Sequence, residues 1–323
     1  MNVLIIRPSA LGDTLMLMPA IIQLRASAKI ILVGRYPGLY FLKPYVHRCI
    51  DYEGSGWHTL FLERPDYVHA LPITTVDKVV AFLSDPERRV KDNLKTCFSS
   101  ESVYLFPAFP PKREKTHVAL YLSRCLEMAG LPIDAGKSFE EALMRPLIER
   151  ETMSNQQKKI VLHPGSGGKK KNHPPSFWLK LIKDMRKRSF NEKFIFLLGP
   201  TEEPLHSFYR NNLCNKDIDI VFSPEKGKLS SLLKKAYLYI GHDSGITHLA
   251  AMLGTPTIAL FKNSSIHQWR PLGPAVRVIE NKEAGPSLIT TILKEAGELS
   301  GNSKQQNTNL KQIPMIEIQN SKQ

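Results

Sequence analysis

The stretch YLYIGHDSGITHLAAMLGTPTIALF, residues 237–261, places a polar turn and a short helical pattern between two apolar runs. The first run is short and rich in Tyr and Ile, which is typical of a buried strand. The turn Asp243–Gly245 leads directly into the helical pattern, which ends at Gly254 before the second run begins. A strand, a helix and another strand in this order predict a βαβ unit, which requires a parallel sheet.

The rest of the second half repeats this alternation. Apolar runs predict further strands at 160–165, 193–199 and 219–223. Helical patterns are expected at 175–188, 203–213, 228–236 and 287–299. Pro175 stands at the first turn of its predicted helix, where proline is well tolerated. We therefore predict a doubly wound, Rossmann-like α/β domain.

The first half begins with the same unit. Residues 2–7 read as a buried strand, 14–27 as a helix and 29–34 as the next strand. Pro19 should kink the helix or restart it. The middle of this half is less regular, although 117–131 is a strong amphipathic helix pattern with Gly130 as its expected end. Two α/β halves suggest two Rossmann-like domains that face each other across a cleft.

A chain of 323 residues is long enough for two domains of about 150 residues each. The sequence turns polar after the helix at 117–131, and we place the boundary so that the domains cover 1–147 and 148–299. The remaining segment, 300–323, is rich in Asn, Gln and Lys, and we expect it to be a disordered tail.

Composition narrows the class of protein. No apolar run approaches the ~18 residues of a membrane span, and the N-terminal run is a poor signal peptide. The four single cysteines favour free thiols of a cytoplasmic protein over a disulfide framework or a zinc site. The net charge of +14 favours an anionic partner, which could be nucleic acid, a phosphorylated substrate or an anionic membrane surface. The aromatic residues lie mostly in apolar runs, which argues against nucleic acid as the partner.

Ligands of open α/β sheets bind at the carboxyl ends of the strands. Behind the first strand, Gly12 permits a close approach of backbone to ligand. Asp13 stands at the mouth of the following helix, where it could act as a general base or could merely cap the helix. Both interpretations remain open at this point.

Two further loops combine small and charged residues. In HPGSGGKKKNHPPSFW, residues 163–178, Ser166 and Gly167 lie in a glycine-rich turn beside Lys169–Lys171, which favours anion binding over a plain solvated turn. The turn at Asp243–Gly245 opens a helix whose unpaired N–H groups suit a diphosphate, while Asp243 or Ser244 is also the expected cap.

The sequence leaves the roles of one acidic residue and one histidine open. Glu202 could receive ribose hydroxyls or could cap a helix, and His248 alone would more often be a packed core residue. The carboxylates do not cluster at the spacing of metal ligands, so no metal and no cofactor is expected.

In combination and in this order, these motifs resemble glycosyltransferase family 9, the heptosyltransferases of lipopolysaccharide core synthesis. The resemblance is carried by IIRPSALGDTLMLMPAI at 5–21, by residues 163–178 and by residues 241–261, and it covers residues 1 to about 280. The chain departs from the family pattern at His242, where the family usually has Asn. It also departs at 262–265, where KNSS replaces a continuation that begins Gly-Pro-Thr.

The resemblance implies a GT-B fold, an acceptor-binding first domain, a nucleotide-sugar-binding second domain, and metal-independent transfer with inversion. By position, it implies that the catalytic base is Asp13. It also implies phosphate contacts from Ser166 and Lys171, a diphosphate turn at Asp243, Ser244 and Gly245 followed by His248, and a nucleoside contact near Glu202.

The sequence therefore predicts a glycosyltransferase that transfers a heptose from ADP-heptose to a lipid-linked oligosaccharide acceptor at the inner membrane surface. The expected location is the cytoplasm, with peripheral attachment to the membrane. The alternatives are another nucleotide-linked sugar as donor, a hexose or N-acetylhexosamine, or a sugar-nucleotide epimerase of the same fold.

Overall fold

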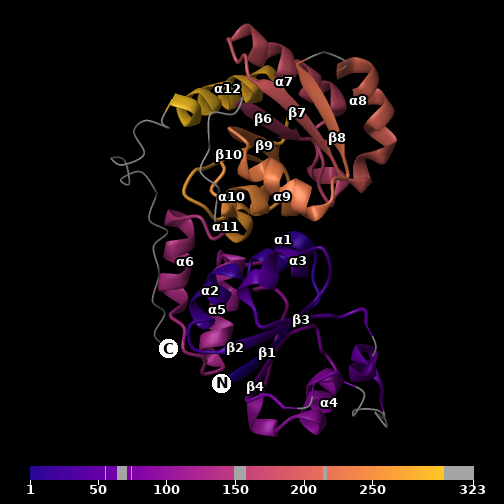
Figure 1. Ribbon diagram of the computed structural model, residues 1–323, viewed down its shortest axis with the longest axis vertical. Coiled ribbons are helices and arrows are strands. Elements are labelled where there is room, and N and C mark those ends of the chain that lie inside the picture. Colours follow the sequence, from indigo (N-terminus) through magenta and orange to yellow (C-terminus); the bar gives the residue numbers. More distant parts are fainter. Residues whose placement is uncertain (55, 64–70, 74, 149–157, 214–216, 302–323) are drawn as a thin grey trace.

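The computed structural model describes residues 1–54, 56–63, 71–73, 75–148, 158–213 and 217–301. The chain forms two α/β units, each built on one parallel sheet, and both doubly wound domains predicted from the sequence are confirmed. Figure 1 shows the second unit above the first, with helices on both faces of each sheet.

The first sheet has the order β3-β2-β1-β4-β5. Its strands are β1 (Asn2–Arg7), β2 (Lys29–Gly34), β3 (Arg48–Asp51), β4 (Lys78–Phe82) and β5 (Val103–Phe106). Its helices are α1 (Leu11–Leu15), α2 (Met18–Leu24), α3 (Gly38–Leu42), α4 (Arg89–Cys97), α5 (Val118–Met128) and α6 (Ala135–Met144). Short 3₁₀ turns add η1 (Lys43–Tyr45), η2 (Trp57–Phe61) and η4 (Ser100–Ser102).

The second sheet has the order β11-β10-β9-β6-β7-β8. Its strands are β6 (Lys159–His163), β7 (Lys193–Leu198), β8 (Ile218–Phe222), β9 (Leu238–His242), β10 (Thr257–Phe261) and β11 (Val276–Glu280). Its helices are α7 (Pro175–Lys187), α8 (His206–Leu213), α9 (Lys226–Lys234), α10 (Gly245–Met252), α11 (Ile266–Trp269) and α12 (Pro286–Gly301). The 3₁₀ turns η5 (Lys169–Lys171) and η6 (Pro200–Leu205) follow β6 and β7.

Several element ends match the local signals in the sequence. Pro19 is the second residue of α2 and separates it from α1, so the predicted helix restarts rather than bends. Gly130 and Gly254 adopt φ values of +71° and +73° just after their helices, a conformation in which glycine has no steric penalty. Pro175 opens α7 as expected.

The polar segment assigned to the domain boundary contains a helix that the sequence reading missed. α6 lies within it and begins at Ala135, just after the N-cap residue Asp134, whose side chain accepts the N–H of Lys137. Residues 149–157, next to the expected boundary, lie outside the described residues. Ser300 and Gly301 still belong to α12, and the rest of the expected tail also lies outside the described residues.

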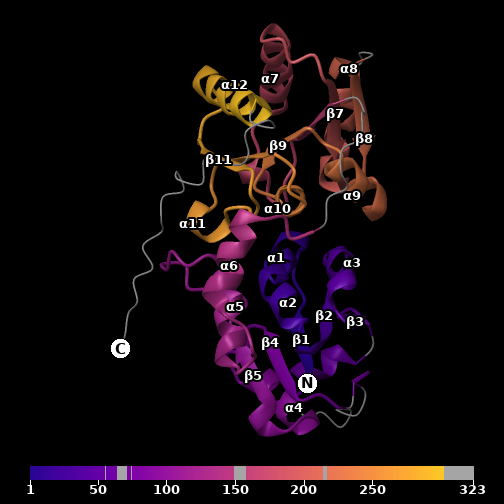
Figure 2. The ribbon, with the colours of Figure 1, turned by 60° about the vertical axis from the view of Figure 1, so that its left-hand side comes forward.

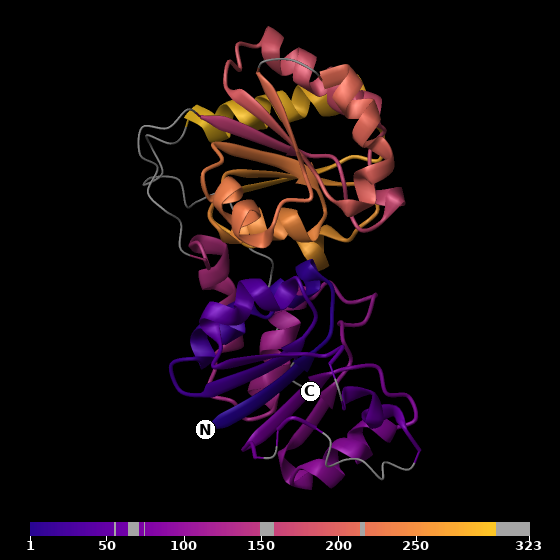
Figure 3. The same cartoon turned by 45° about the vertical axis from the view of Figure 1, so that its right-hand side comes forward.

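The buried apolar residues connect the two units. One cluster extends from Leu15 of α1 and Ile21 of α2 to Leu249 and Met252 of α10. Figure 3 shows helices of the first unit facing helices of the second unit at the junction. Among the described residues, no helix combines the length and the apolar character that a membrane crossing requires.

Candidate active site

The candidate site lies where the two sheets change winding direction. In the first sheet the chain leaves β1 for β2 on one side and later returns to β4 on the other. In the second sheet β6 and β9 are the central neighbours. Ligands of doubly wound folds bind at such switch points, beyond the carboxyl ends of the strands. Figures 1 and 2 show α1, which follows β1, facing α10, which follows β9, across the junction.

The starts of α1 and α10 are in close backbone contact. A Cβ atom added to Gly12 would lie 3.3 Å from the Cα of Gly245 and 3.2 Å from the Cδ2 of His248. The structure therefore brings together residues more than 200 positions apart, and the glycines permit it. This proximity places the first turn of α1 beside the first turn of α10.

Asp13 is the third residue of α1, and its side chain does not cap the helix. The N-cap position is occupied by Ala10, with no side-chain hydrogen bond. The capping interpretation of Asp13 is therefore wrong, because the helix begins one turn earlier than that interpretation requires. Burial raises the pKa of Asp13 above its usual value, although the charges of Arg7, His248 and Lys171 partly offset this effect.

Asp243 provides a second carboxylate with the opposite behaviour. Lys171 Nζ lies 2.7 Å from its Oδ2, and His248 Nε2 lies 3.5 Å from its Oδ1. Burial alone would raise the pKa of Asp243, but hydrogen bonds and charge from His248 and Lys171 outweigh burial and hold it well below its usual value. Two nearby carboxylates whose pKa values are driven apart are a common arrangement for dividing acid–base and charge-holding roles.

The start of α10 is capped by Ser244, as one of the two sequence interpretations proposed. Its side chain accepts the N–H of Thr247, and the Thr247 hydroxyl contacts Tyr239, 3.0 Å away. The first N–H groups of a helix have no carbonyl partner inside that helix. Since Ser244 takes that of Thr247, the N–H groups of Gly245 and Ile246 are the ones that could meet a ligand.

His242 links the β9 end to the loop after β6. Its Nδ1 lies 2.8 Å from the Pro164 carbonyl, and its Nε2 accepts the N–H of His173 at 2.9 Å. These contacts define a neutral ring that donates through Nδ1. Burial lowers the pKa of His242 to about 3, and the neighbouring His173 adds to this. His242 therefore ties the end of β9 to the loop after β6.

The glycine-rich loop after β6 is folded back on itself. The Ser166 hydroxyl is buried and lies 2.6 Å from Asn172 Oδ1 and 3.0 Å from the Gly168 carbonyl. Gly167 has open space where a Cβ would be. Lys171 ends η5, and its ammonium group is the part of this loop that reaches Asp243. Of the predicted phosphate contacts, Lys171 thus lies at the junction, while the Ser166 hydroxyl is engaged within its own loop.

Glu202 is buried and holds the start of η6. Its Oε2 accepts the N–H of Gly199 at 2.8 Å, and its Oε1 lies 2.5 Å from the Thr201 hydroxyl. A Cβ on Gly165 would lie 2.1 Å from the Glu202 carboxyl carbon, so this glycine accommodates the acid. The structure thus gives Glu202 the capping role that the sequence left open. Glu202 follows β7, which is separated by β6 from β9, the strand that Asp243 follows.

Two side-chain contacts join the domains beside the site. Gln268 of α11 donates to the main-chain carbonyls of Pro111 and Glu114 at 3.2 and 2.9 Å. His117 Nε2 lies 2.8 Å from the Arg270 carbonyl. The loop between β5 and α5 is therefore held against α11 next to the start of α1.

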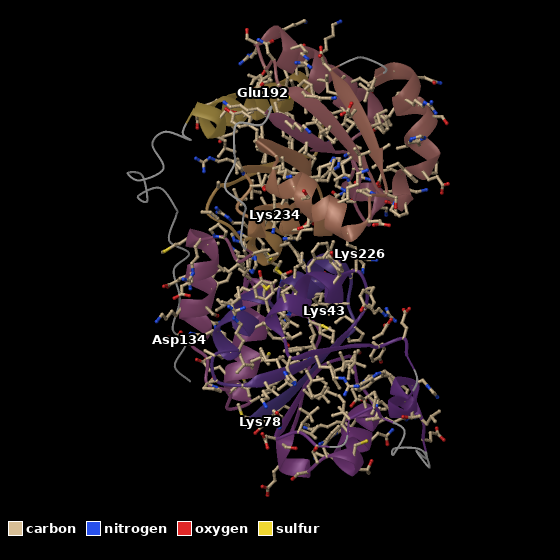
Figure 4. All side chains as sticks on the ribbon, in the orientation of Figure 1. Lys43, Lys78, Asp134, Glu192, Lys226 and Lys234 are labelled. Atoms are coloured by element: carbon tan, nitrogen blue, oxygen red, sulfur yellow. The ribbon has the colours of Figure 1, made fainter. Side chains whose placement is uncertain are left out.

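A third contact lies on the other side of the junction. There Lys226, at the start of α9, stands over the ring of Tyr36 at 5.9 Å. Figure 4 labels Lys226 and Lys43 on the two sides of this part of the junction.

Sequence reasoning missed Arg7 and His242 as parts of this site. Each is a charged or polar residue at the last position of an otherwise apolar, buried strand. That position is the signal that could have identified both, because strand ends in such sheets face the ligand crevice.

The arrangement can support displacement of an anionic leaving group. Asp13 offers a carboxylate with a raised pKa on the first domain. The second domain presents Lys171 and the start of α10 opposite it. Within the described ranges, no three His, Cys, Asp or Glu side chains gather in a way that could hold a metal ion.

Comparison with known sequences identifies the family. The sequence model of glycosyltransferase family 9 (heptosyltransferase) matches residues 88–294, more than half of the chain. A lipopolysaccharide heptosyltransferase 1 of Campylobacter coli is 30% identical over 128 residues. That alignment covers 38% of this chain and 37% of the relative, so it spans little more than a third of the relative's length.

Comparison with solved structures identifies the fold. The ADP-heptose lipopolysaccharide heptosyltransferase II of E. coli has a TM-score of 0.66 at 18% identity, covering 94% of this chain and 100% of that chain. A family 9 glycosyltransferase from Veillonella parvula has a TM-score of 0.69 at 16% identity, covering 94% and 98%. At such identities the similarity shows the fold alone, which is GT-B: two Rossmann-like domains facing each other.

Proposed function

This chain belongs to glycosyltransferase family 9, and on that premise we propose that it transfers a heptose from ADP-heptose to a lipopolysaccharide core acceptor, with inversion and without a metal ion. The observation that carries the proposal is the opposition of Asp13 on one domain to Lys171 and the start of α10 on the other. We assign acceptor binding to residues 1–147 and donor binding to residues 148–299.

Asp13 is the general base of the proposed reaction. Its carboxylate takes the proton of the acceptor hydroxyl as that oxygen attacks the anomeric carbon of the donor sugar. A base works best when its pKa is close to the working pH, and burial moves the pKa of Asp13 in that direction. Because the attack comes from the side of the first domain, the leaving group departs towards the second domain and the anomeric configuration inverts.

Lys171 and the start of α10 receive the leaving nucleoside diphosphate. The bond between the anomeric carbon and the diphosphate oxygen breaks, and the electron pair stays on that oxygen. The charge that develops there is stabilised by the Lys171 ammonium and by the N–H groups of Gly245 and Ile246. Removing one such donor costs ~3 kcal/mol of transition-state stabilisation in comparable sites.

Asp243 and His248 support this receiving site. Asp243 stays ionised because its pKa is lowered, and it orients the Lys171 ammonium through the 2.7 Å contact. Before the diphosphate binds, the negative charge of Asp243 also balances the positive charge of Lys171. Gly12, Ser166, Gly167 and Glu202 are also assigned to substrate binding, on the basis of their positions in the family pattern.

The acceptor is expected to be anionic and held at a membrane. The chain carries a net charge of +14, which would attract a phosphorylated, lipid-linked oligosaccharide to the cytoplasmic membrane face. This assignment makes the protein a peripheral enzyme of that surface.

The test is a panel of nucleotide sugars incubated with the purified protein and with extracted core oligosaccharide. Transfer from ADP-heptose, with release of ADP that depends on the acceptor, is the expected result. Transfer only from a nucleotide-linked hexose or N-acetylhexosamine would replace the donor assignment. Conversion of a donor into its epimer with no acceptor present would overturn transfer itself.

A further inference from the structure

Arg7 is a fully buried arginine at the carboxyl end of β1, directly below the start of α1. Its Nε donates to the main-chain carbonyl of Asp13 at 3.0 Å, and its Nη1 donates to the Ala108 carbonyl at 2.7 Å. The guanidinium carbon lies 5.6 Å from the ring centre of Phe82 and 5.3 Å from that of Phe109. Two carbonyls and two rings therefore fix the position of this cation.

Within the described part of the chain, no hydrogen bond or ion pair joins Arg7 to a carboxylate. No ion pair joins Arg7 to Asp13, and the buried Nη2 atom has no hydrogen-bond partner among the described residues. Burying a charge without a paired ion is costly, so such a residue needs a reason to persist. The acidic group that interacts most strongly with it is the carboxylate of Asp13.

We propose that Arg7 is a positioning residue for Asp13, one that fixes the main chain of α1 and keeps the Asp13 carboxylate ionised without pairing with it. The proposal rests on the function assigned to Asp13 above. A carboxylate that accepts a proton must be ionised, but it must also keep its oxygen atoms free for the acceptor hydroxyl. An arginine restrained by the carbonyls of Asp13 and Ala108 meets both conditions.

The other charged groups that face Asp13 cannot replace Arg7 in this role. Lys171 is paired with Asp243, and His248 also lies beside that carboxylate. Asp243 itself acts in the opposite direction, since its negative charge disfavours a second ionised acid. Arg7 is the largest of the charges that offset the effect of burial on the pKa of Asp13.

The surroundings of Arg7 itself leave it charged. Burial lowers the pKa of Arg7 to about 10, which is still far above neutral pH. Tyr121 and Cys125 of α5 are the other titratable groups that face it. Burial raises the pKa of both the Tyr121 hydroxyl and the Cys125 thiol, so both stay neutral. Of the three titratable groups that act on Arg7, Asp13 is therefore the one that can carry a negative charge at neutral pH.

The test is a direct titration of Asp13 by carbon-13 NMR of protein labelled at the Asp carboxyl groups, with the signal assigned by its loss in Asp13→Asn. In Arg7→Met the pKa of Asp13 should rise by about one unit or more, the usual size of the effect of a nearby opposite charge. In Arg7→Lys, which keeps the charge, the pKa should stay closer to that of the unchanged protein.

A matched control is Lys78→Met. Lys78 also donates to a main-chain carbonyl, that of Ala129 at 2.6 Å, and lies over an aromatic ring, that of Tyr104 at 5.0 Å. It stands at the opposite, amino end of the same sheet, as Figure 4 shows. Its loss should leave the titration of Asp13 unchanged.

The activity of the same variants separates the two parts of the proposal. In Arg7→Met the acid limb of the pH–rate profile should move to higher pH, together with the pKa measured by NMR. In Arg7→Lys the limb should stay in place while the plateau rate falls ten-fold or more, because one ammonium cannot serve both carbonyls.

An unshifted pKa of Asp13 in folded Arg7→Met would overturn the electrostatic part, and an unchanged plateau rate in Arg7→Lys would overturn the positioning part. If Arg7→Met does not fold, Arg7→Gln takes its place in the titration. Since the titration needs no turnover, it decides the role of Arg7 even if the proposed sugar transfer fails.

Discussion

A Cβ atom added to Gly245 would lie only 2.9 Å from the main-chain nitrogen of Gly12 and 2.9 Å from the Cβ of Leu11. Both neighbours belong to the other domain. The first domain therefore occupies the space that a side chain at Gly245 would need, so the fold itself calls for a glycine at this position.

We therefore predict that Gly245→Ala separates the domains. The backbone of Gly12 cannot yield as a flexible side chain would, so the starts of α1 and α10 must move apart. The radius of gyration from small-angle X-ray scattering should increase, and ADP should bind ten-fold or more weakly, ~1.4 kcal/mol.

Gly297→Ala is the control for this substitution. Gly297 lies within α12 and has nothing within 4 Å of an added Cβ, so the change should leave both measurements as they are. Weaker ADP binding with an unchanged radius of gyration in Gly245→Ala would contradict domain separation. It would mean that the added methyl group contacts the phosphate directly.

Asp13→Asn should lower turnover and raise stability at the same time. Loss of a general base lowers turnover by ~10² or more. Because burial raises the pKa of Asp13, its ionised form is disfavoured in the folded protein above that pKa, and a neutral Asn removes this cost. The gain in unfolding free energy should be present at pH 7 and shrink as the pH is lowered, since the carboxyl then becomes neutral as well. Turnover assays and urea unfolding at several pH values measure both effects.

Asp134→Asn serves as the matched control. Asp134, which is labelled in Figure 4, caps α6 far from the junction. Asn caps a helix nearly as well as Asp. Neither turnover nor its pH dependence should change. Normal turnover in folded Asp13→Asn would eliminate Asp13 as the base.

Local signals predicted much of the fold and some of the site. The alternation of apolar runs with helical patterns indicated a parallel sheet in each half, although no strand was predicted at the positions of β3 and β11. Ser244 was one of two residues expected to cap α10. Pro175 and Gly254 mark helix ends because their own backbone restrictions act wherever the chain runs. These features depend on neighbours in sequence, which a sequence displays directly.

The relationships between distant residues could not be predicted. Lys171 and Asp243 meet only because β6 and β9 are adjacent in the sheet. The residues of a single strand do not determine which strands lie beside it. Asp13 seemed a helix cap because the helix start was placed one turn late. The tie from His242 to Pro164 needs the packed geometry of two loops, so its role appears only in the structure.

Buried neutral histidines should make the protein sensitive to acid. Burial lowers the pKa of His117 and of His173 to about 4 each and that of His242 to about 3. The stability that comes from keeping them neutral is complete above their unfolded pKa of ~6.5 and is lost as the pH falls towards their folded values. For each such histidine, the free energy of unfolding falls by up to ~1.4 kcal/mol for each pH unit of acidification in that window.

Urea unfolding at pH values from 7 to 4.5 measures this dependence. His242→Asn should be less stable at pH 7, because it loses one of the two ties, and its stability should depend less steeply on pH. A free energy of unfolding that stays flat across the range would contradict the assignment of buried, neutral rings.

Activity is expected to survive an excess of EDTA. In the proposed mechanism Lys171 and the N–H groups at the start of α10 stabilise the leaving diphosphate, a task that a divalent cation performs in many other transferases. Turnover should be equal with and without the chelator. Loss of activity that Mg²⁺ or Mn²⁺ restores would refute the metal-free mechanism.

Lys171 and Asp243 should affect ADP binding in a strongly non-additive way. Lys171→Met removes the cation and also leaves the buried Asp243 carboxylate without its ammonium partner beside the place proposed for the diphosphate. ADP should therefore bind more weakly by ten-fold or more, ~1.4 kcal/mol, while adenosine, which has no phosphates, should be affected little. In the double variant with Asp243→Asn the repulsion is also gone, so ADP should bind more tightly than in Lys171→Met alone.

Calorimetry with ADP and adenosine gives both comparisons. The control is Lys169→Met, which changes an exposed lysine of the same 3₁₀ turn and should lose little affinity. Additive losses would mean that Asp243 does not act on the diphosphate, and equal losses for ADP and adenosine would mean that the site has only been deformed.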